Sequence, residues 1–122
     1  MRTWIGALTF VSFLLLGGAA LAAPAAEAKS AKGVENHEPV DEASEFAVKD
    51  TVWVWSRITD AEGTKVKHVW KRDGNEEWSV ALPVRSKKWT TNSRRVVKAG
   101  AYVVEILAED GSKLTEVSFT VK

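Results

Sequence analysis

Few side chains in this 122-residue chain could do chemistry. The sequence has two histidines and no cysteine, and no serine lies in a Gly-x-Ser-x-Gly elbow, so neither a thiolate nor an elbow serine offers a nucleophile. His37 and His68 are too far apart in the sequence to indicate a local zinc site. Asp73 and Asp110 each precede a glycine, and turn formation explains them without a catalytic role. We therefore expect no catalytic residue, no metal, no cofactor and no enzyme activity.

A second group of residues could bind a ligand. A strand pattern places His68 and Trp70 on one face, and residues 89–95 combine an indole with a run of hydrogen-bond donors. A flat ring beside donors suits a sugar, a peptide or an anionic group. The predicted binding surface consists of six residues: His68, Trp70, Trp89, Ser93, Arg94 and Arg95.

The same residues also have a structural interpretation. His68 would then be a core histidine whose ring is satisfied by a hydrogen bond, and Trp89 would plug one end of the fold. Tryptophan is abundant here: five of the six indoles lie between residues 53 and 89, at Trp53, Trp55, Trp70, Trp78 and Trp89. Each buried indole stabilises a fold by roughly 4–6 kcal/mol, and five exceed a usual net stability of about 5–15 kcal/mol. Most of these rings are therefore expected to hold the fold together.

The N-terminus predicts export. Arg2 is followed by an apolar stretch at residues 5–16 and by an Ala-Leu-Ala cleavage motif at residues 20–22. Residues 1–22 are therefore predicted to be a signal peptide, and the small and polar residues 23–32 a flexible tether. The apolar stretch is too short for a membrane span, so we expect none after cleavage and place the protein in the periplasm or outside the cell.

The remaining chain is expected to form one domain, at residues 33–122. Removing Arg2 lowers the number of Lys+Arg from 17 to 16, which balances the 16 Asp+Glu, so nucleic acid is not an expected partner. The charges are unevenly placed. Residues 33–45 carry acids and no Lys or Arg, and residues 85–98 carry six bases and no acid. The two segments either face each other or face water, or the basic segment binds an anionic polymer.

Alternation of apolar and polar residues predicts an all-β fold after residue 33. With turn residues every 8 to 15 positions, the pattern is typical of an immunoglobulin-like antiparallel β-sandwich of about seven strands. The segment at 46–58 is apolar on both faces and is therefore expected to be central. The other predicted strands cover residues 34–40, 65–71, 88–91, 94–97, 101–108 and 113–122.

The hairpin after residue 71 has two possible registers. A two-residue loop at Asp73-Gly74 would place Val69 opposite Trp78, whereas a three-residue loop would place His68 opposite Trp78. The second register is preferred because it separates apolar from charged side chains. Its apolar face would contain Val66, His68, Trp70, Trp78, Val80 and Leu82.

The motifs also resemble a known family. The residues that carry the resemblance are His68-Val69-Trp70, Trp89, Ser93-Arg94, Gly100-Ala101-Tyr102-Val103-Val104, Asp110-Gly111 and Phe119, with Glu38-Pro39-Val40-Asp41 as an entry motif. Together they resemble an uncharacterised bacterial domain family of unknown function, over roughly residues 33–122. The family often lies at the end of exported or membrane-associated proteins. The resemblance implies a β-sandwich and no particular chemistry.

The leading hypothesis is an exported, non-catalytic module that binds an envelope glycan or protein through the six-residue surface. One alternative is an assembly module that contacts another protein through a sheet edge. A second alternative is binding of an anionic polymer through residues 85–98.

Overall fold

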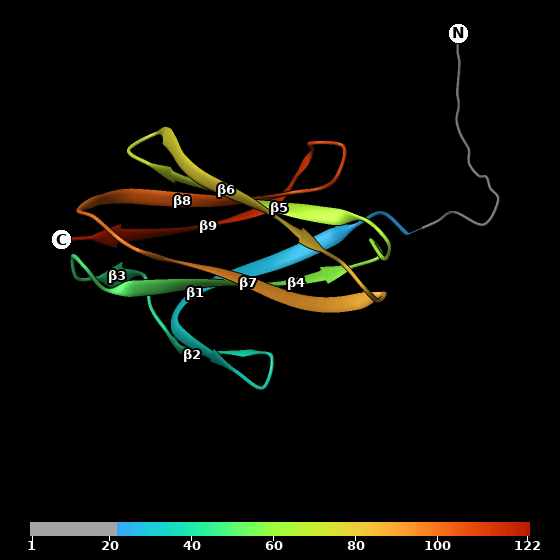
Figure 1. Ribbon diagram of the computed structural model, residues 1–122, viewed down its shortest axis with the longest axis horizontal. Coiled ribbons are helices and arrows are strands. Elements are labelled where there is room, and N and C mark those ends of the chain that lie inside the picture. Colours follow the sequence, from blue (N-terminus) through green and yellow to red (C-terminus); the bar gives the residue numbers. More distant parts are fainter. Residues whose placement is uncertain (1–21) are drawn as a thin grey trace, which may run out of the picture.

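The computed structural model describes residues 22–122, which form nine β-strands and no helix (Figure 1). The strands are β1 (Ala25–Glu35), β2 (Glu38–Glu42), β3 (Glu45–Phe46), β4 (Thr51–Thr59), β5 (Lys65–Arg72), β6 (Asn75–Pro83), β7 (Lys88–Val96), β8 (Gly100–Leu107) and β9 (Lys113–Val121). The predicted signal peptide, except for Ala22, lies outside the described residues. Within residues 22–122 there is no helix long and apolar enough to cross a membrane.

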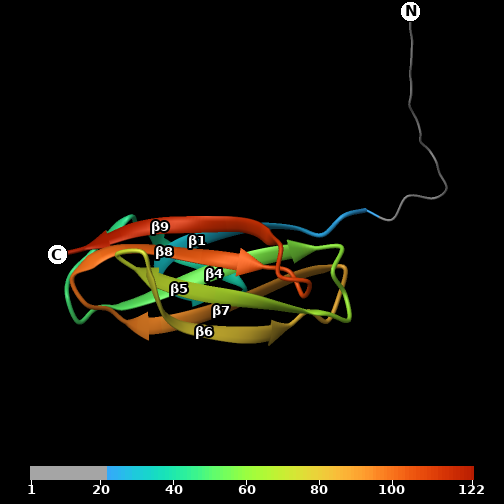
Figure 2. The same cartoon turned by 90° about the horizontal axis from the view of Figure 1, so that it is seen from above.

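The strands form two facing sheets, which lie one above the other in Figure 1 and overlap when seen from above in Figure 2. Sheet A has the order β2-β1-β4-β7, and sheet B has the order β3-β9-β8-β5-β6. Neighbouring strands are antiparallel except for β3 and β9, which are parallel. The predicted all-β sandwich is therefore confirmed, with nine strands where about seven were expected.

The connectivity follows the immunoglobulin pattern. The neighbours β1-β4-β7 correspond to strands A-B-E of such domains, and β5-β8-β9 correspond to C-F-G. Tyr102, near the start of β8, accepts a hydrogen bond at its hydroxyl from the N–H of Lys98 (3.1 Å), which is the arrangement of a tyrosine corner. Val104, two residues later, occupies the place of a disulfide cysteine in antibody domains and is fully buried. Apolar packing thus replaces the disulfide in this cysteine-free chain.

An aromatic cluster lies in the core between the sheets. Tyr102 stacks on Phe119 with ring centroids 4.9 Å apart. Trp70 contacts both rings edge-on, at 6.3 and 6.0 Å, and Phe46 contacts Phe119 at 5.3 Å. Such edge-to-face pairs add about 0.5–1.5 kcal/mol each to the stabilisation from buried area. The cluster joins β3, β5, β8 and β9 at one end of the sandwich.

The predicted tether is wrong for most of its length, because residues 25–32 belong to β1. This strand pairs with β4 from Ala25↔Thr59 to Ala31↔Trp53 and lies inside sheet A. Ala26 and Ala28 pack against the core. The core-facing side chains in the first half of β1 are too small to give a hydrophobic period in the sequence, yet small side chains suit a strand covered closely by its neighbours. The sandwich therefore begins at residue 25 rather than 33.

Three other strand predictions need correction. The predicted strand at 34–40 crosses a tight turn at Asn36 and His37, whose φ angles are 50° and 64°. The predicted strand at 46–58 is interrupted at residues 47–50, where the Asp50 carboxylate accepts a hydrogen bond from the Ala47 N–H (2.9 Å). Residues 88–96 form one strand, β7, instead of two. The central position of β4, between β1 and β7, is confirmed.

Neither predicted hairpin register is right, although the preferred apolar face is confirmed. The loop has two residues, Asp73 and Gly74, with φ of 52° and 86°, as in a type I′ turn. A bulge on β6 then leaves Glu77 unpaired and places Trp70 opposite Trp78. Because Glu77 is unpaired, each later β6 residue is shifted by one pairing position. This shift turns Trp78, Val80 and Leu82 to the same face as Trp70, as expected.

Removing β1 tests the corrected N-terminal boundary. A chain that starts at residue 32 is expected to lose cooperative unfolding, because β4 loses one of its two partner strands and the core loses the cover that Ala26 and Ala28 provide. A chain that starts at residue 23 should unfold as one transition. The measurement is urea denaturation followed by tryptophan fluorescence, and equal midpoints for the two chains would show that residues 23–31 are a tether after all.

Candidate functional site

The six residues predicted to form one surface separate into two groups. His68, Trp70 and Ser93 are 0%, 1% and 7% exposed and lie in the interior. The other three residues belong to β7 and are at least partly accessible: Trp89 is half-buried, and Arg94 and Arg95 are exposed. Consecutive strand residues point to opposite faces, so Ser93 and Arg94 cannot serve one surface. The buried three are almost completely shielded from solvent, so they do not form an exposed binding surface.

The buried group forms a polar bridge between the sheets. His68 comes from β5 of sheet B, and Ser56 and Ser93 come from β4 and β7 of sheet A. The His68 Nε2 atom lies 2.9 Å from Ser56 Oγ, and its Nδ1 atom lies 2.7 Å from Ser93 Oγ. The Trp70 Nε1–H donates a second hydrogen bond to Ser93 Oγ at 3.0 Å. We refer to these four residues as the Ser–His–Ser bridge.

The hydrogen-bonding capacities fit a neutral histidine. An indole N–H is only a donor, so the Ser93 oxygen accepts from Trp70 in every arrangement. A neutral imidazole has one donor and one acceptor nitrogen, and a serine hydroxyl on each side matches either tautomer. This geometry supports the interpretation of His68 as a satisfied core residue.

Burial lowers the pKa of His68 from 6.5 to about 4. The unfolded chain therefore takes up a proton as the pH falls below about 6.5, while the folded protein stays neutral at this position until about pH 4. The contribution of neutral His68 to stability is complete above pH 6.5 and decreases as the pH falls toward 4.

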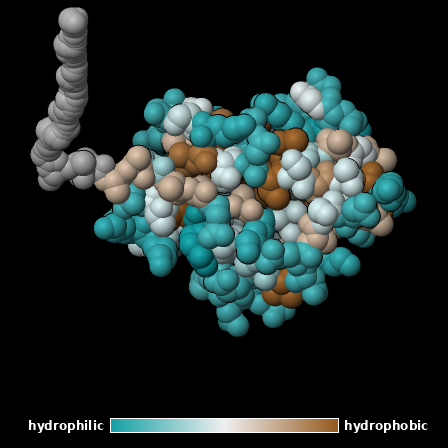
Figure 3. Space-filling model, turned by 180° about the vertical axis from the view of Figure 1, so that it is seen from behind, coloured by the Kyte–Doolittle hydropathy of each residue, from teal (hydrophilic) through white to brown (hydrophobic). Residues whose placement is uncertain are grey.

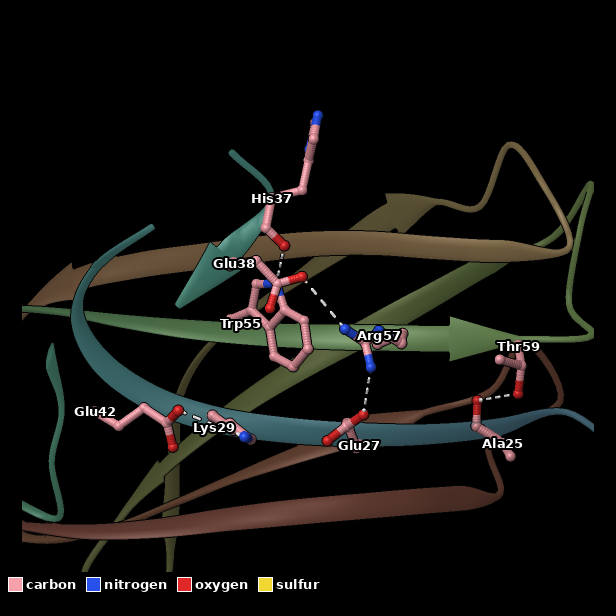
Figure 4. Close-up of polar contacts among 9 residues, drawn as sticks. All are labelled: Ala25, Glu27, Lys29, His37, Glu38, Glu42, Trp55, Arg57 and Thr59. Atoms are coloured by element: carbon pink, nitrogen blue, oxygen red, sulfur yellow. Dashed lines mark hydrogen bonds and ion pairs between the residues drawn. The ribbon is translucent and has the colours of Figure 1, made fainter. Parts of the chain in front are cut away.

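A second tryptophan organises the outer face of sheet A. Trp55 points away from the core, yet it is only 2% exposed. Its Nε1–H donates to the backbone carbonyl of His37 at 2.8 Å, so the turn between β1 and β2 folds over the ring (Figure 4). The guanidinium of Arg57 lies 5.1 Å from the centre of the same indole. Trp55 thus fixes the β1–β2 hairpin against the sheet.

A groove of about 450 Å³ runs beside this hairpin, and we name it the outer groove. Arg57 is held at the groove by two carboxylates, Glu27 Oε1 at 3.1 Å and Glu38 Oε2 at 3.3 Å (Figure 4). On the opposite wall, Ser86 Oγ donates to the carbonyl of Lys88 at 2.8 Å. The outer groove is lined by His37, Glu38, Arg57, Ser86, Lys88, Trp89 and Thr90.

The two surface arginines of the predicted site point in different directions. Arg94 lies on the outer face of sheet A, with its guanidinium 4.7 Å from the centre of the Trp53 ring. Arg95 reaches across the sandwich rim to Trp78, at 4.5 Å, beside a smaller cavity of about 150 Å³. Only Trp89 of the six predicted residues lines the outer groove.

Sequence reasoning missed Glu38 and Arg57 as groove residues. Glu38 belongs to the acidic segment at 33–45, and Arg57 belongs to neither charged segment. Arg57 follows Trp53 and Trp55 at a spacing of two, and this row of outward residues was a signal for the groove. The acidic segment at 33–45 and the basic segment at 85–98 do not form ion pairs with each other. Within residues 22–122, Lys87 is the only one of the six bases in an ion pair, with Asp60 at 3.9 Å.

The fold and the site define an immunoglobulin-like sandwich with a polar bridge in its core and a groove on one outer face. Residues 63–121 match the family model described as Protein of unknown function (DUF2914). The resemblance to a domain family of unknown function is thereby confirmed over these residues, which include His68, Trp70 and Ser93. The predicted entry motif at 38–41 lies outside the match. A comparison with curated proteins found no match.

Two serine substitutions test the Ser–His–Ser bridge. Ser93→Ala removes the partner of both Trp70 Nε1–H and His68 Nδ1, whereas Ser56→Ala removes one partner of His68. A buried polar group without a partner costs about 1–3 kcal/mol, so Ser93→Ala should lower the free energy of unfolding about twice as much as Ser56→Ala. Urea unfolding measures both values, and equal losses would contradict the shared role of Ser93.

The low pKa of His68 predicts acid sensitivity. Between pH 7.5 and 5, the free energy of unfolding should fall by about 2 kcal/mol through this residue, and the His68→Gln variant should lack this part of the slope. An NMR titration of wild type gives an independent check that needs no variant. A His68 ring resonance that shifts with a midpoint near 6.5 would contradict the prediction.

Proposed function

We propose that this protein is an exported, non-catalytic module that binds a glycan of the cell envelope on the outer face of sheet A. The observation that carries the proposal is the outer groove, whose lining combines Trp89 with hydrogen-bond donors and acceptors from three separate parts of the chain. Sugars present apolar C–H faces to aromatic rings and hydroxyl groups that both donate and accept. Sites of this kind combine aromatic walls with a few placed polar groups.

The charges of the outer groove favour a ligand of low net charge. Arg57 is already paired with Glu27 and Glu38, so its positive charge is compensated within the protein. Glu38 supplies an acceptor for a sugar hydroxyl, and Lys88 and Thr90 supply donors on the other wall. A mixed lining of this kind suits hydroxyl groups better than a dense row of phosphates or carboxylates.

The surface continues from the groove along β7. Thr90 and Arg94 lie on the same face of the strand, about 13 Å apart at about 3.3 Å per residue. Arg94 stacks on Trp53 there and forms a second flat, polar surface. The combined length suits an oligosaccharide better than a single sugar.

Export is proposed from the predicted signal peptide at residues 1–22. The β-sandwich starts at residue 25, so the chain after the predicted cleavage site consists almost entirely of the folded domain. A periplasmic or extracellular location would bring the outer groove into contact with envelope glycans.

Direct binding measurements test the glycan proposal. Trp89→Ala should weaken binding to the best ligand from a panel of neutral and anionic oligosaccharides by about tenfold or more, as calorimetry measures. Trp78→Ala is the matched control, because Trp78 is also half-buried but lies on β6, outside the outer groove.

Three results would count against the proposal: no binding by wild type, equal loss in both variants, or unchanged binding by Trp89→Ala. Affinity that falls steeply with salt would instead favour the alternative of an anionic polymer bound at residues 85–98. Thermal unfolding of each variant shows whether a loss of binding reflects a loss of the fold.

A further inference from the structure

β7 is an open edge of sheet A. Among residues 22–122 its only neighbour in the sheet is β4, and all nine of its residues pair with β4 without a bulge. The strand contains neither proline nor glycine. The β6 edge of sheet B differs, because it carries the bulge at Glu77 and ends at Pro83. A long and regular edge such as β7 can pair with an added strand.

The backbone groups that β7 leaves free can be identified from its two ends. The Val97 N–H donates to Asp50 O at 3.0 Å, and the Val97 C=O accepts from the Lys49 N–H at 2.9 Å, so residue 97 faces β4. At the other end, the Lys87 C=O accepts from the Asp60 N–H at 2.9 Å. Backbone direction alternates along an antiparallel strand. The residues whose N–H and C=O face the open edge are therefore Lys88, Thr90, Asn92, Arg94 and Val96.

An apolar strip lies beside this edge. β6 and β7 lie at the same edge of the two stacked sheets, at the bottom of the view in Figure 2. Half-buried side chains that face inward from the two edges form the strip, in which the Arg95 guanidinium covers the Trp78 ring: Trp78, Val80, Leu82 and Trp89. The opposite side of the molecule is mainly hydrophilic, with small and separate hydrophobic areas (Figure 3). Inward side chains of a strand added to β7 would cover the apolar strip.

The charges around β7 select the kind of strand. Lys88 and Arg94 point to the outer face, and neither forms an ion pair within residues 22–122. Pairing of β7 with β7 of a second copy would bring these bases and the rest of the basic segment at 85–98 together, which like-charge repulsion disfavours. Carboxylates on an added strand would instead lie beside both bases.

We propose that β7 binds an extended acidic segment of a partner protein as an additional strand of sheet A. Alternate residues of this segment are apolar and cover the apolar strip, and the residues between them carry carboxylates beside Lys88 and Arg94. The proposal does not rest on glycan binding: the edge and the outer groove share Lys88, Trp89 and Thr90, but Asn92 at the centre of the edge does not line the outer groove, so substitutions at Asn92 distinguish the two.

The probe is a labelled peptide as long as β7, nine residues, with valine at the odd positions, glutamate at the second and eighth positions and threonine between them. Asn92→Pro removes an edge N–H that faces away from β4, so the ladder with β4 stays intact. Fluorescence anisotropy should show binding to wild type, a loss of about tenfold or more in Asn92→Pro, and less than about threefold in the control Asn92→Ala.

Further measurements test the same edge without relying on a proline variant. A peptide N-methylated on alternate amides should bind about tenfold more weakly, and Arg94→Ala should weaken the parent peptide by about threefold. Hydrogen exchange should slow at the amides of residues 90, 92 and 94 when peptide is added. The proposal is overturned by no binding, by equal binding of a scrambled or lysine-for-glutamate peptide, or by a dimer that protects these amides without peptide. It is also overturned if polyphosphate binds equally well and Asn92→Pro leaves peptide binding unchanged.

Discussion

The imidazole of His68 connects the two sheets of this protein at the centre of the core. It reaches from β5 to hydroxyl groups on β4 and β7, and Trp70 joins the same network through Ser93. A buried polar group is stable only with its partners in place, so these bonds restrict how the two sheets can lie relative to each other. Nonspecific apolar packing allows small sliding movements that the bridge does not. The positions of β7 and of everything attached to it therefore depend on this interaction.

The tryptophans show how one residue type serves different purposes in a small sandwich. Trp70 belongs to the core aromatic cluster, and Trp55 holds the β1–β2 hairpin on an outer face through the carbonyl of His37. Trp53 and Trp78 are covered by arginines from β7. Trp89 is left to line the outer groove. The abundance of indoles thus reflects a chain without disulfides, in which aromatic packing stabilises both the core and the outer face of sheet A.

β7 combines three roles through the alternation of a strand. Ser93 points inward and belongs to the bridge, Arg94 points outward beside Trp53, and the backbone at Asn92 faces the open edge. A core position and a position exposed for binding are therefore next to each other in the sequence. This arrangement explains why a motif such as Trp-x-x-x-Ser-Arg can mix residues of different purpose, and why the bridge, the groove and the edge respond to different substitutions.

The sequence by itself determined the all-β sandwich, the central position of β4, the apolar face of the β5–β6 hairpin and the family resemblance, because alternation with a period of two is local and needs no knowledge of neighbours. It also offered the core interpretation of His68 without deciding for it. Tertiary structure alone decided that the alanine-rich residues after position 24 form an inner strand, that Ser56 completes the bridge, and that Glu38 and Arg57 meet at a groove. The physical reason is that small side chains carry no hydrophobic period, and that burial and hydrogen-bond partners depend on strands that are distant in the chain.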